Sequence, residues 1–134
     1  MLVRFSVENL LSFRERVELS MVGSKQEHRN PNDVISPNTS EGIALLKLAL
    51  VYGANASGKS NLVKAMYIAR DLILHPAKSE EKLTFLPFKL DRYCYKKPSR
   101  FEFEIKLHER YFAYGFSNRT NRQTLENTSI FERK

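Results

Sequence analysis

The sequence contains no tryptophan and a single cysteine among its 134 residues. One cysteine, Cys94, cannot form a disulfide within the chain, so the fold does not depend on oxidation and a cytoplasmic location is expected. No apolar run is long enough to cross a bilayer, and the first residues lack the apolar core of a signal peptide. These absences predict a cytoplasmic protein that does not enter a membrane.

Internal repeats and low-complexity tracts are also absent. Hydrophobic residues make up 42% of the chain and charged residues 28%, which is typical of a globular protein. The length suits one domain over residues 1–134 and is too short for two. The net charge of +7 favours anionic partners, which include nucleotides, nucleic acids and acidic protein surfaces.

One stretch of the chain combines basic and aromatic residues. Its members are Lys89, Arg92, Lys96, Lys97 and Arg100, interleaved with Phe88, Tyr93, Tyr95 and Phe101. A patch of this kind can hold a phosphate backbone while its aromatic rings stack on bases. A solvated loop that leads into a strand has the same composition. The pattern therefore leaves nucleic-acid binding open.

Alternating apolar and polar residues predict strands in the first part of the chain. Residues 3–8 and 16–21 both alternate with a period of two, and the short connection 11–15 predicts that they form a hairpin. The polar segment 23–42 follows, with proline and asparagine clusters, and we predict that it is a mobile loop.

The last third of the chain alternates in the same way. Residues 101–107, 112–116 and 123–131 predict three strands, separated by short polar turns at 108–110 and 117–122. Strands joined by such short turns form an antiparallel meander.

The centre of the chain follows a different pattern. The short apolar run Leu48–Tyr52 ends at Gly53, which predicts a strand buried on both faces. Apolar residues then recur at helical spacing between Lys59 and Leu74, and Pro76 would end that helix. A buried strand, a loop and a helix, flanked by antiparallel strands, predict an α/β fold.

The connection between that strand and helix matches the spacing G-x-x-x-x-G-K-[ST] at Gly53, Gly58, Lys59 and Ser60. The glycines allow consecutive backbone N–H groups to face one anion, and the helix start adds free N–H donors. Lys59 would contact the β- and γ-phosphates of a nucleotide, and the Ser60 hydroxyl would bind Mg²⁺. A chance glycine-rich turn is the alternative, but it would not explain the predicted strand and helix on either side.

Hydrolysis needs further groups, because a carboxylate must hold the metal and another group must place the attacking water. We find no apolar strand that ends in such a carboxylate. Asp91 follows a stretch that is too short and too polar, and Glu102 and Glu104 belong to a strand of the predicted meander. The sequence therefore contains half of an active site.

The run Tyr52–Leu62, with Asn55 inside the loop, resembles the ATP-binding heads of the ABC and SMC class. Residues 5–13 are similar to the first strand of those heads. The whole pattern most resembles a bacterial branch of AAA-family ATPases from phage-defence and abortive-infection systems. The likeness continues through residues 87–91, 101–103 and 114–116, although only the phosphate loop is a specific motif.

The resemblance implies a P-loop NTPase fold, namely the N-terminal lobe of an ABC/SMC-like head with an antiparallel β subdomain. It implies ATP and Mg²⁺ as cofactors, a head-to-head homodimer around two ATP molecules, and in many cases an effector protein that the ATPase controls. Lys59 would be the catalytic residue and Ser60 the magnesium ligand. The nucleotide-binding residues would be Gly53, Asn55, Ala56, Ser57, Gly58, Lys59, Ser60 and Asn61.

Departures from the family limit this reading. Leu11 stands where SMC-type heads commonly have an arginine, and the glutamine loop, signature segment, second magnesium motif and switch histidine have no counterparts here. We therefore expect the chain to be the N-terminal part of a longer ATPase and to be inactive on its own.

Two other functions remain open from the sequence. A small P-loop kinase would use the basic stretch as a lid, and a binding module would use the nucleotide only as a switch. A GTPase is not favoured, because the sequence has no Asn-Lys-x-Asp run.

Overall fold

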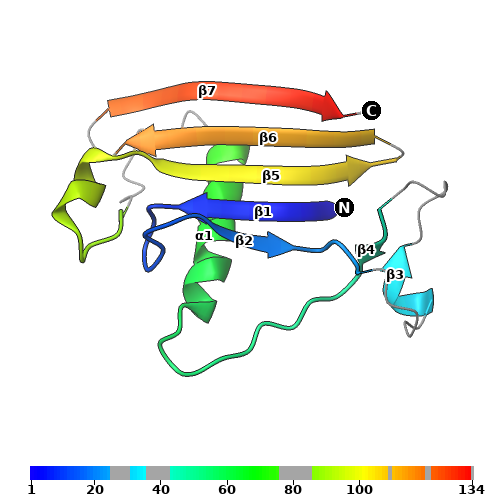
Figure 1. Ribbon diagram of the computed structural model, residues 1–134. Coiled ribbons are helices and arrows are strands. Elements are labelled where there is room, and N and C mark those ends of the chain that lie inside the picture. The colour runs from blue at the N-terminus through cyan, green and yellow to red at the C-terminus, as the bar shows by residue number, and fades with distance from the viewer. Residues whose placement is uncertain (25–30, 36–42, 76–85, 109, 120–121, 134) are drawn as a thin grey trace.

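The computed structural model describes residues 1–24, 31–35, 43–75, 86–108, 110–119 and 122–133. Its main body is a five-stranded antiparallel sheet with the order β2-β1-β5-β6-β7, and one long helix, α1, lies against one face (Figure 1). The strands are β1 Leu2–Glu8, β2 Val17–Ser20, β5 Ser99–Leu107, β6 Arg110–Arg119 and β7 Arg122–Arg133, and the helix is α1 Lys59–Leu74.

The predicted hairpin and meander are both confirmed. β1 pairs with β2, and β5, β6 and β7 follow one another in the sheet. β6 and β7 extend into the segment 117–122, so the connection there is shorter than the sequence suggests. The two parts join where β1 pairs with β5 and Phe5 lies opposite Phe103. This pairing makes one continuous sheet from strands that are far apart in the sequence.

The core lies between this sheet and α1. Phe5 and Val7 of β1 are almost fully buried, and they belong to one cluster with Ala65 and Ala69 of the helix. The small alanines leave room for large side chains of the sheet, which include Phe101 and Phe116. The predicted helix 59–74 is confirmed at both ends, and Tyr67 on its predicted polar side is exposed. The phosphate loop is thereby attached to a helix that the core holds in place.

The predicted buried strand at Leu48–Tyr52 is wrong for this structure. The segment forms no strand, and Figure 1 shows it running away from the sheet towards the start of α1. The exposed fractions of Leu50 and Tyr52 are 82% and 93%. A strand needs neighbouring strands to bind its N–H and C=O groups, and the described part of the chain offers none beside this segment. The segment therefore has the amino-acid composition of a strand but does not form one.

Smaller elements lie near the end of the sheet where β1 begins (Figure 1). The 3₁₀-helix η1 spans Pro31–Asp33, and the short strands β3 Val34–Ile35 and β4 Leu45–Leu46 pair with each other. Part of the loop predicted at 23–42 thus contains regular structure, while residues 25–30 and 36–42 lie outside the described residues. No helix among the described residues has the length and apolar character needed to cross a membrane.

Asn9 links the end of β1 to a distant segment. It is 2% exposed, and its side-chain nitrogen donates to the carbonyl oxygens of Cys94 at 2.8 Å and Lys97 at 3.0 Å. Its side-chain oxygen accepts from the Phe88 N–H at 3.2 Å, and its carbonyl accepts from the Ser99 hydroxyl at 2.6 Å. One buried amide therefore ties the end of β1 to the segment 88–97 through hydrogen bonds to several backbone groups.

Replacing Asn9 with alanine is expected to destabilise the protein by about 2–3 kcal/mol, because it removes the buried hydrogen bond to Cys94 and the partly buried ones to Lys97 and Phe88. The measurement is urea unfolding followed by circular dichroism. Asn55→Ala is the control, since Asn55 is exposed and should change stability by less than about 0.5 kcal/mol. Equal unfolding midpoints for the two variants would contradict the role given to Asn9.

Candidate functional site

The phosphate loop, residues 53–60, connects the exposed segment to α1. Ala56 and Gly58 have positive φ angles of 64° and 96°, so the backbone reverses direction within the loop. The Ser57 N–H donates to the Ala54 carbonyl at 3.3 Å, which closes a turn inside the loop. This left-handed conformation costs glycine little and is the physical reason for Gly58 at this position.

The first turn of α1 begins directly after Gly58. The Asn61 and Leu62 N–H groups both donate to the Gly58 carbonyl, at 2.9 and 3.0 Å. Gly58, the N-cap residue, has no side chain to cap this helix start, and no other described residue is recorded as a cap. The Lys59 and Ser60 N–H groups precede that first turn of hydrogen bonds, where a helix start leaves donors free. A free helix start also carries the positive end of the helix dipole, which favours an anion such as phosphate.

The Lys59 side chain folds back over its own loop. Its ammonium nitrogen donates to the carbonyl oxygens of Gly53 at 2.8 Å and Ala54 at 2.7 Å. It takes part in no ion pair with a described residue, so its charge is not neutralised. The ammonium group therefore lies at the loop. When it contacts an anion, it gives up hydrogen bonds to neutral carbonyl groups and does not have to break an ion pair with a described residue.

The turn after β1 packs against the phosphate loop, which the sequence did not indicate. The Asn61 side-chain nitrogen donates to the Ser12 hydroxyl oxygen at 3.0 Å. A methyl group built on Gly58 would lie 3.1 Å from that same oxygen and 3.7 Å from the Phe13 ring. Ser12 and Phe13 thus pack against the phosphate loop at Gly58 and against the start of α1. No local pattern could have identified them, because the contact joins residues 49 positions apart.

The loop and helix start enclose a hollow of about 380 Å³. Its lining consists of Asn55, Ala56, Ser57, Gly58, Lys59, Ser60 and Asn61, which are seven of the eight predicted nucleotide-binding residues. The eighth, Gly53, contacts the Lys59 side chain instead. The structure therefore brings the predicted residues together around a cradle of backbone groups and one cation.

The phosphate loop supplies only part of the oxygen ligands that Mg²⁺ needs. The Ser60 hydroxyl is exposed at the helix start, and Mg²⁺ accepts one or two protein oxygens when phosphates and water supply the rest. Among the described residues, no group of three or more histidine, cysteine, aspartate or glutamate side chains could hold a metal ion. The site fits a magnesium ion that arrives with a phosphate ligand, and it does not form a separate metal centre.

The described carboxylates do not complete the site. Asp91 accepts from the Tyr93 N–H and pairs with Arg14 at 2.9 Å. Glu102 and Glu104 alternate with the buried Phe101 and the partly buried Phe103, which pack towards α1, so both glutamates lie on the opposite face of the sheet. The sheet separates them from the helix start.

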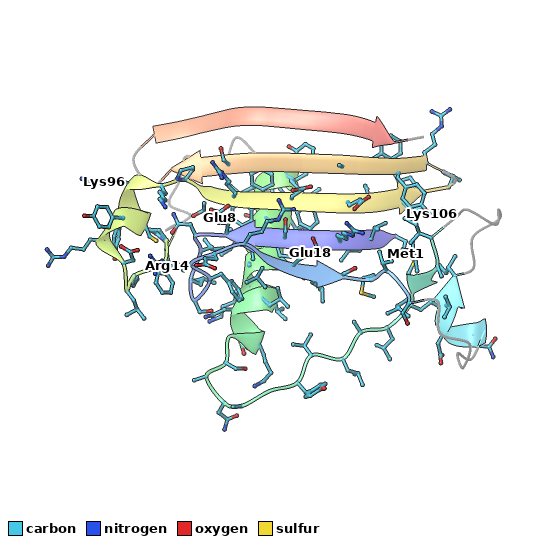
Figure 2. All side chains as sticks on the ribbon, in the orientation of Figure 1. Met1, Glu8, Arg14, Glu18, Lys96 and Lys106 are labelled. Atoms are coloured by element: carbon cyan, nitrogen blue, oxygen red, sulfur yellow. The ribbon has the colours of Figure 1, made fainter. Side chains whose placement is uncertain are left out.

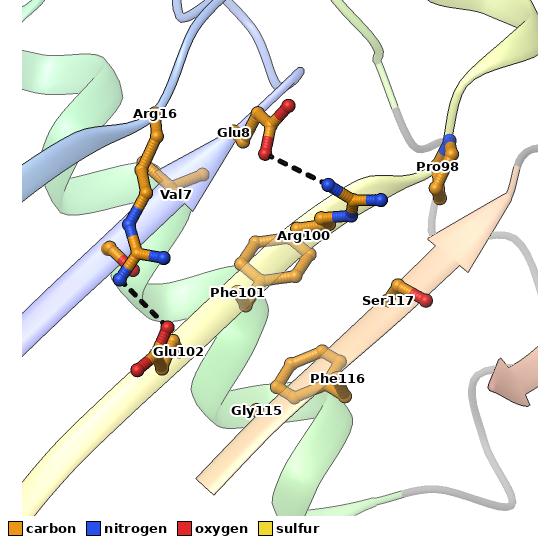
Figure 3. Close-up of a pocket in the computed structure, with 11 residues that line it drawn as sticks. Val7, Glu8, Arg16, Pro98, Arg100, Phe101, Glu102, Gly115, Phe116 and Ser117 are labelled. Carbon is orange, nitrogen blue, oxygen red and sulfur yellow. Dashed lines mark hydrogen bonds and ion pairs between the residues drawn. The ribbon is translucent and has the colours of Figure 1, made fainter. Parts of the chain in front are cut away.

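A slightly larger hollow, of about 420 Å³, lies on that opposite face (Figure 3). There Arg16 pairs with Glu102 at 2.8 Å and Arg100 with Glu8 at 3.5 Å. Each arginine is already neutralised, and each carboxylate would repel a phosphate. The smaller hollow at the phosphate loop is therefore the better anion site, since its cation has no carboxylate partner among the described residues.

Comparison with known proteins identifies a family. A family model described as "AAA domain, putative AbiEii toxin, Type IV TA system" matches residues 48–133, which include the phosphate loop, α1 and the meander. No curated protein and no solved structure matches the chain.

Proposed function

The chain belongs to this AAA-domain family of nucleotide-binding ATPases, and from that premise we propose that residues 53–61 bind ATP together with Mg²⁺. The family match covers most of the chain and begins just before the phosphate loop. It supports a nucleotide-binding ATPase module. The assignment of ATP to particular residues rests on the geometry of the loop.

The observation that carries the proposal is the unneutralised Lys59 beside an uncapped helix start. Among the described residues, Lys59 donates to two carbonyl oxygens alone, and the N-cap residue Gly58 offers the first turn of α1 no side-chain cap. Phosphate oxygens would accept from both kinds of donor. Charge-assisted hydrogen bonds of this type are roughly twice as strong as bonds between neutral groups, so a triphosphate would displace the carbonyl partners.

Each residue of the loop has a distinct part in this proposal. The Lys59 ammonium binds the β- and γ-phosphates, while the loop backbone from Asn55 to Gly58 surrounds the phosphate chain. The Ser60 hydroxyl would bind Mg²⁺, which supplies charge neutralisation at the phosphates when bound. Asn61 holds the helix start against Ser12 through its side-chain hydrogen bond. Binding and orientation thus come from this segment alone.

We propose that hydrolysis requires groups from outside the described residues, in an ABC/SMC-like head. The exposed run Leu48–Tyr52 has the composition of a strand but no partner strand in the described part of the chain. An additional segment or a second subunit that pairs with this run would also bring a carboxylate to the magnesium ion. A homodimer around two ATP molecules is the form of completion that we propose.

The family description names a toxin of a type IV toxin–antitoxin system. We therefore propose that the ATP-bound state controls a defence effector in the cytoplasm. Nucleotide binding without hydrolysis is the second candidate, favoured by the engagement of Asp91, Glu102 and Glu104 elsewhere. Phosphate release by the protein separates the two candidates.

Replacing Ser60 with alanine is expected to weaken ATP binding about tenfold in the presence of Mg²⁺ and little in a chelator. The reason is that the substitution removes one metal ligand and leaves the backbone donors and Lys59 in place. The measurement is isothermal titration calorimetry with ATP, with Mg²⁺ and with EDTA.

Ser57→Ala is the matched control, because it removes a hydroxyl from the same loop without removing a proposed metal ligand. Its ATP affinity should respond to Mg²⁺ as the unmodified protein does. An equal loss for Ser60→Ala in Mg²⁺ and in EDTA would show that the hydroxyl does not bind the metal.

A further inference from the structure

A rigid basic turn lies at one end of the sheet. The 3₁₀-helix η3 spans Arg92–Lys96, and Figure 2 shows Lys96 at the outer end of the molecule. Cys94 at its centre is 4% exposed, and the Cys94 carbonyl accepts from the buried side chain of Asn9 at 2.8 Å. Asp91 caps the turn by accepting from the Tyr93 N–H at 2.9 Å. These bonds hold the backbone of the turn, so the backbone itself needs little ordering when a partner binds.

Three of the exposed side chains in and just before this turn are large apolar or aromatic groups. Tyr93 is 74% exposed, Tyr95 is 51% exposed and Leu90, just before the turn, is 89% exposed. Two exposed rings and an exposed leucine lie within six residues of one another in the sequence. Clustered exposure of this kind indicates a binding surface, whereas single exposed apolar residues are ordinary.

The same segment has an unbalanced positive charge. Lys89, Arg92, Lys96 and Lys97 belong to it, and within the described part of the chain none of them forms an ion pair. Its single carboxylate, Asp91, is already paired with Arg14 at 2.9 Å. By contrast, the arginines on the outer face of the sheet are neutralised by glutamates. Four cations without a carboxylate partner among the described residues therefore lie in the segment where the rings are exposed.

Helical geometry places each ring beside a cation. In a 3₁₀-helix, side chains three positions apart lie in one row. Tyr93 therefore shares a row with Lys96, and Arg92 shares a row with Tyr95. Each row offers one flat ring for a base and one cation for a phosphate. We propose that residues 89–97 bind single-stranded nucleic acid, with Tyr93 and Tyr95 stacking on bases and the four cations contacting the backbone.

Single strands fit this surface better than the alternatives do. A duplex hides the faces of its bases in its own stack, so exposed rings would gain nothing from it beyond charge. An acidic peptide would use the cations but not the rings. Stacking of bases on aromatic side chains is sequence-tolerant and contributes to each bound nucleotide. The combination of rings and cations is the charge and shape complement of an unpaired strand.

The test measures the binding of labelled oligothymidylate of about 20 nucleotides, longer than the roughly 4–16 that one small domain covers. Fluorescence anisotropy of the full chain, without nucleotide, is compared for this strand, a duplex of equal length and polyglutamate. Tyr93→Ala with Tyr95→Ala is expected to lower the affinity for the single strand at least tenfold. Tyr93→Phe with Tyr95→Phe should restore it, because phenylalanine retains the ring.

Matched controls remove the same groups elsewhere. Tyr52→Ala with Tyr67→Ala removes two exposed tyrosines, and Lys64→Ala with Arg70→Ala removes two exposed cations from α1. Arg92→Ala with Lys96→Ala should reduce the slope of log affinity against log salt by about 1.4, from roughly 0.7 for each phosphate contact. The α1 pair should leave the slope unchanged.

Several results would overturn the proposal. These are no binding of the single strand, equal affinity for the duplex or for polyglutamate, and a loss in the tyrosine pair no larger than in its control. Circular dichroism checks that the variants fold. If the double alanine variant does not fold, Tyr93→Ala and Tyr95→Ala are measured singly, and an unchanged affinity in both would count against stacking.

Discussion

Replacing Lys59 with alanine is expected to lower the affinity for ATP about 100-fold or more. The ammonium group is the charged side chain of the phosphate loop, and the described structure gives it only two carbonyl partners. Two charge-assisted bonds to phosphate oxygens, at about 1.5–3 kcal/mol each, correspond to at least two orders of magnitude in Kd. Isothermal titration calorimetry with ATP and Mg²⁺ measures the effect directly.

Lys64→Ala provides a control with the same change of residue on the same helix. Lys64 is exposed and lies more than one turn beyond the loop, so its removal subtracts the same charge without touching the site. Its ATP affinity should stay within about twofold of the original, since exposed charges at a distance are screened by salt. Equal affinities for the Lys59 variant and the original protein would remove the proposed site. Absence of ATP binding by the original protein would likewise contradict the proposed function.

Elements with a strong local pattern could be predicted from the sequence. The helix from Lys59 to Leu74 has apolar residues at helical spacing, and its buried residues Ala65, Ala69 and Leu72 belong to that apolar set. The hairpin of β1 and β2 and the meander of β5 to β7 also follow their alternation. In each case, neighbouring residues determine both the element and the face that it buries.

Long-range contacts could not be predicted in the same way. Nothing in the alternation of β1 specifies that it pairs with β5, almost a hundred residues later. The role of Asn9 depends on Cys94 and Lys97, which meet it only in the folded chain. The run Leu48–Tyr52 shows the opposite case, in which the sequence predicted an element that the structure does not contain. Its composition favours a strand, but a strand also requires partner strands for its N–H and C=O groups.

The candidate site likewise has one part that could be predicted from the sequence and one part that could not. The spacing of Gly53, Gly58, Lys59 and Ser60 identified the loop because phosphate binding needs those residues close together in sequence. The support behind the loop comes from Ser12 and Phe13, which have no motif of their own. Two independent restrictions act on Gly58, namely its positive φ angle and the close approach of Ser12, and their effect can be measured.

Replacing Gly58 with alanine is expected to destabilise the protein by about 2 kcal/mol and to lower ATP affinity more than tenfold. The φ angle of Gly58 is 96°, a conformation that costs a residue with a Cβ atom roughly 1–2 kcal/mol. The new methyl group would also lie 3.1 Å from the Ser12 hydroxyl oxygen, so the turn after β1 must shift. A shift there moves the start of α1 and its phosphate-facing donors. Urea unfolding and calorimetry measure the two effects.

Gly115→Ala is the matched control, because Gly115 lies in β6 and a methyl group there would be 3.6 Å from its nearest neighbour, an ordinary contact. Alanine in a strand loses less backbone entropy than glycine on folding, so this variant should be as stable as the original or about 0.5 kcal/mol more stable. Its ATP affinity should not change. If Gly58→Ala behaved like Gly115→Ala in both measurements, the loop would not depend on its left-handed residue. A loss of stability without a loss of affinity would place the phosphate-binding groups elsewhere in the chain.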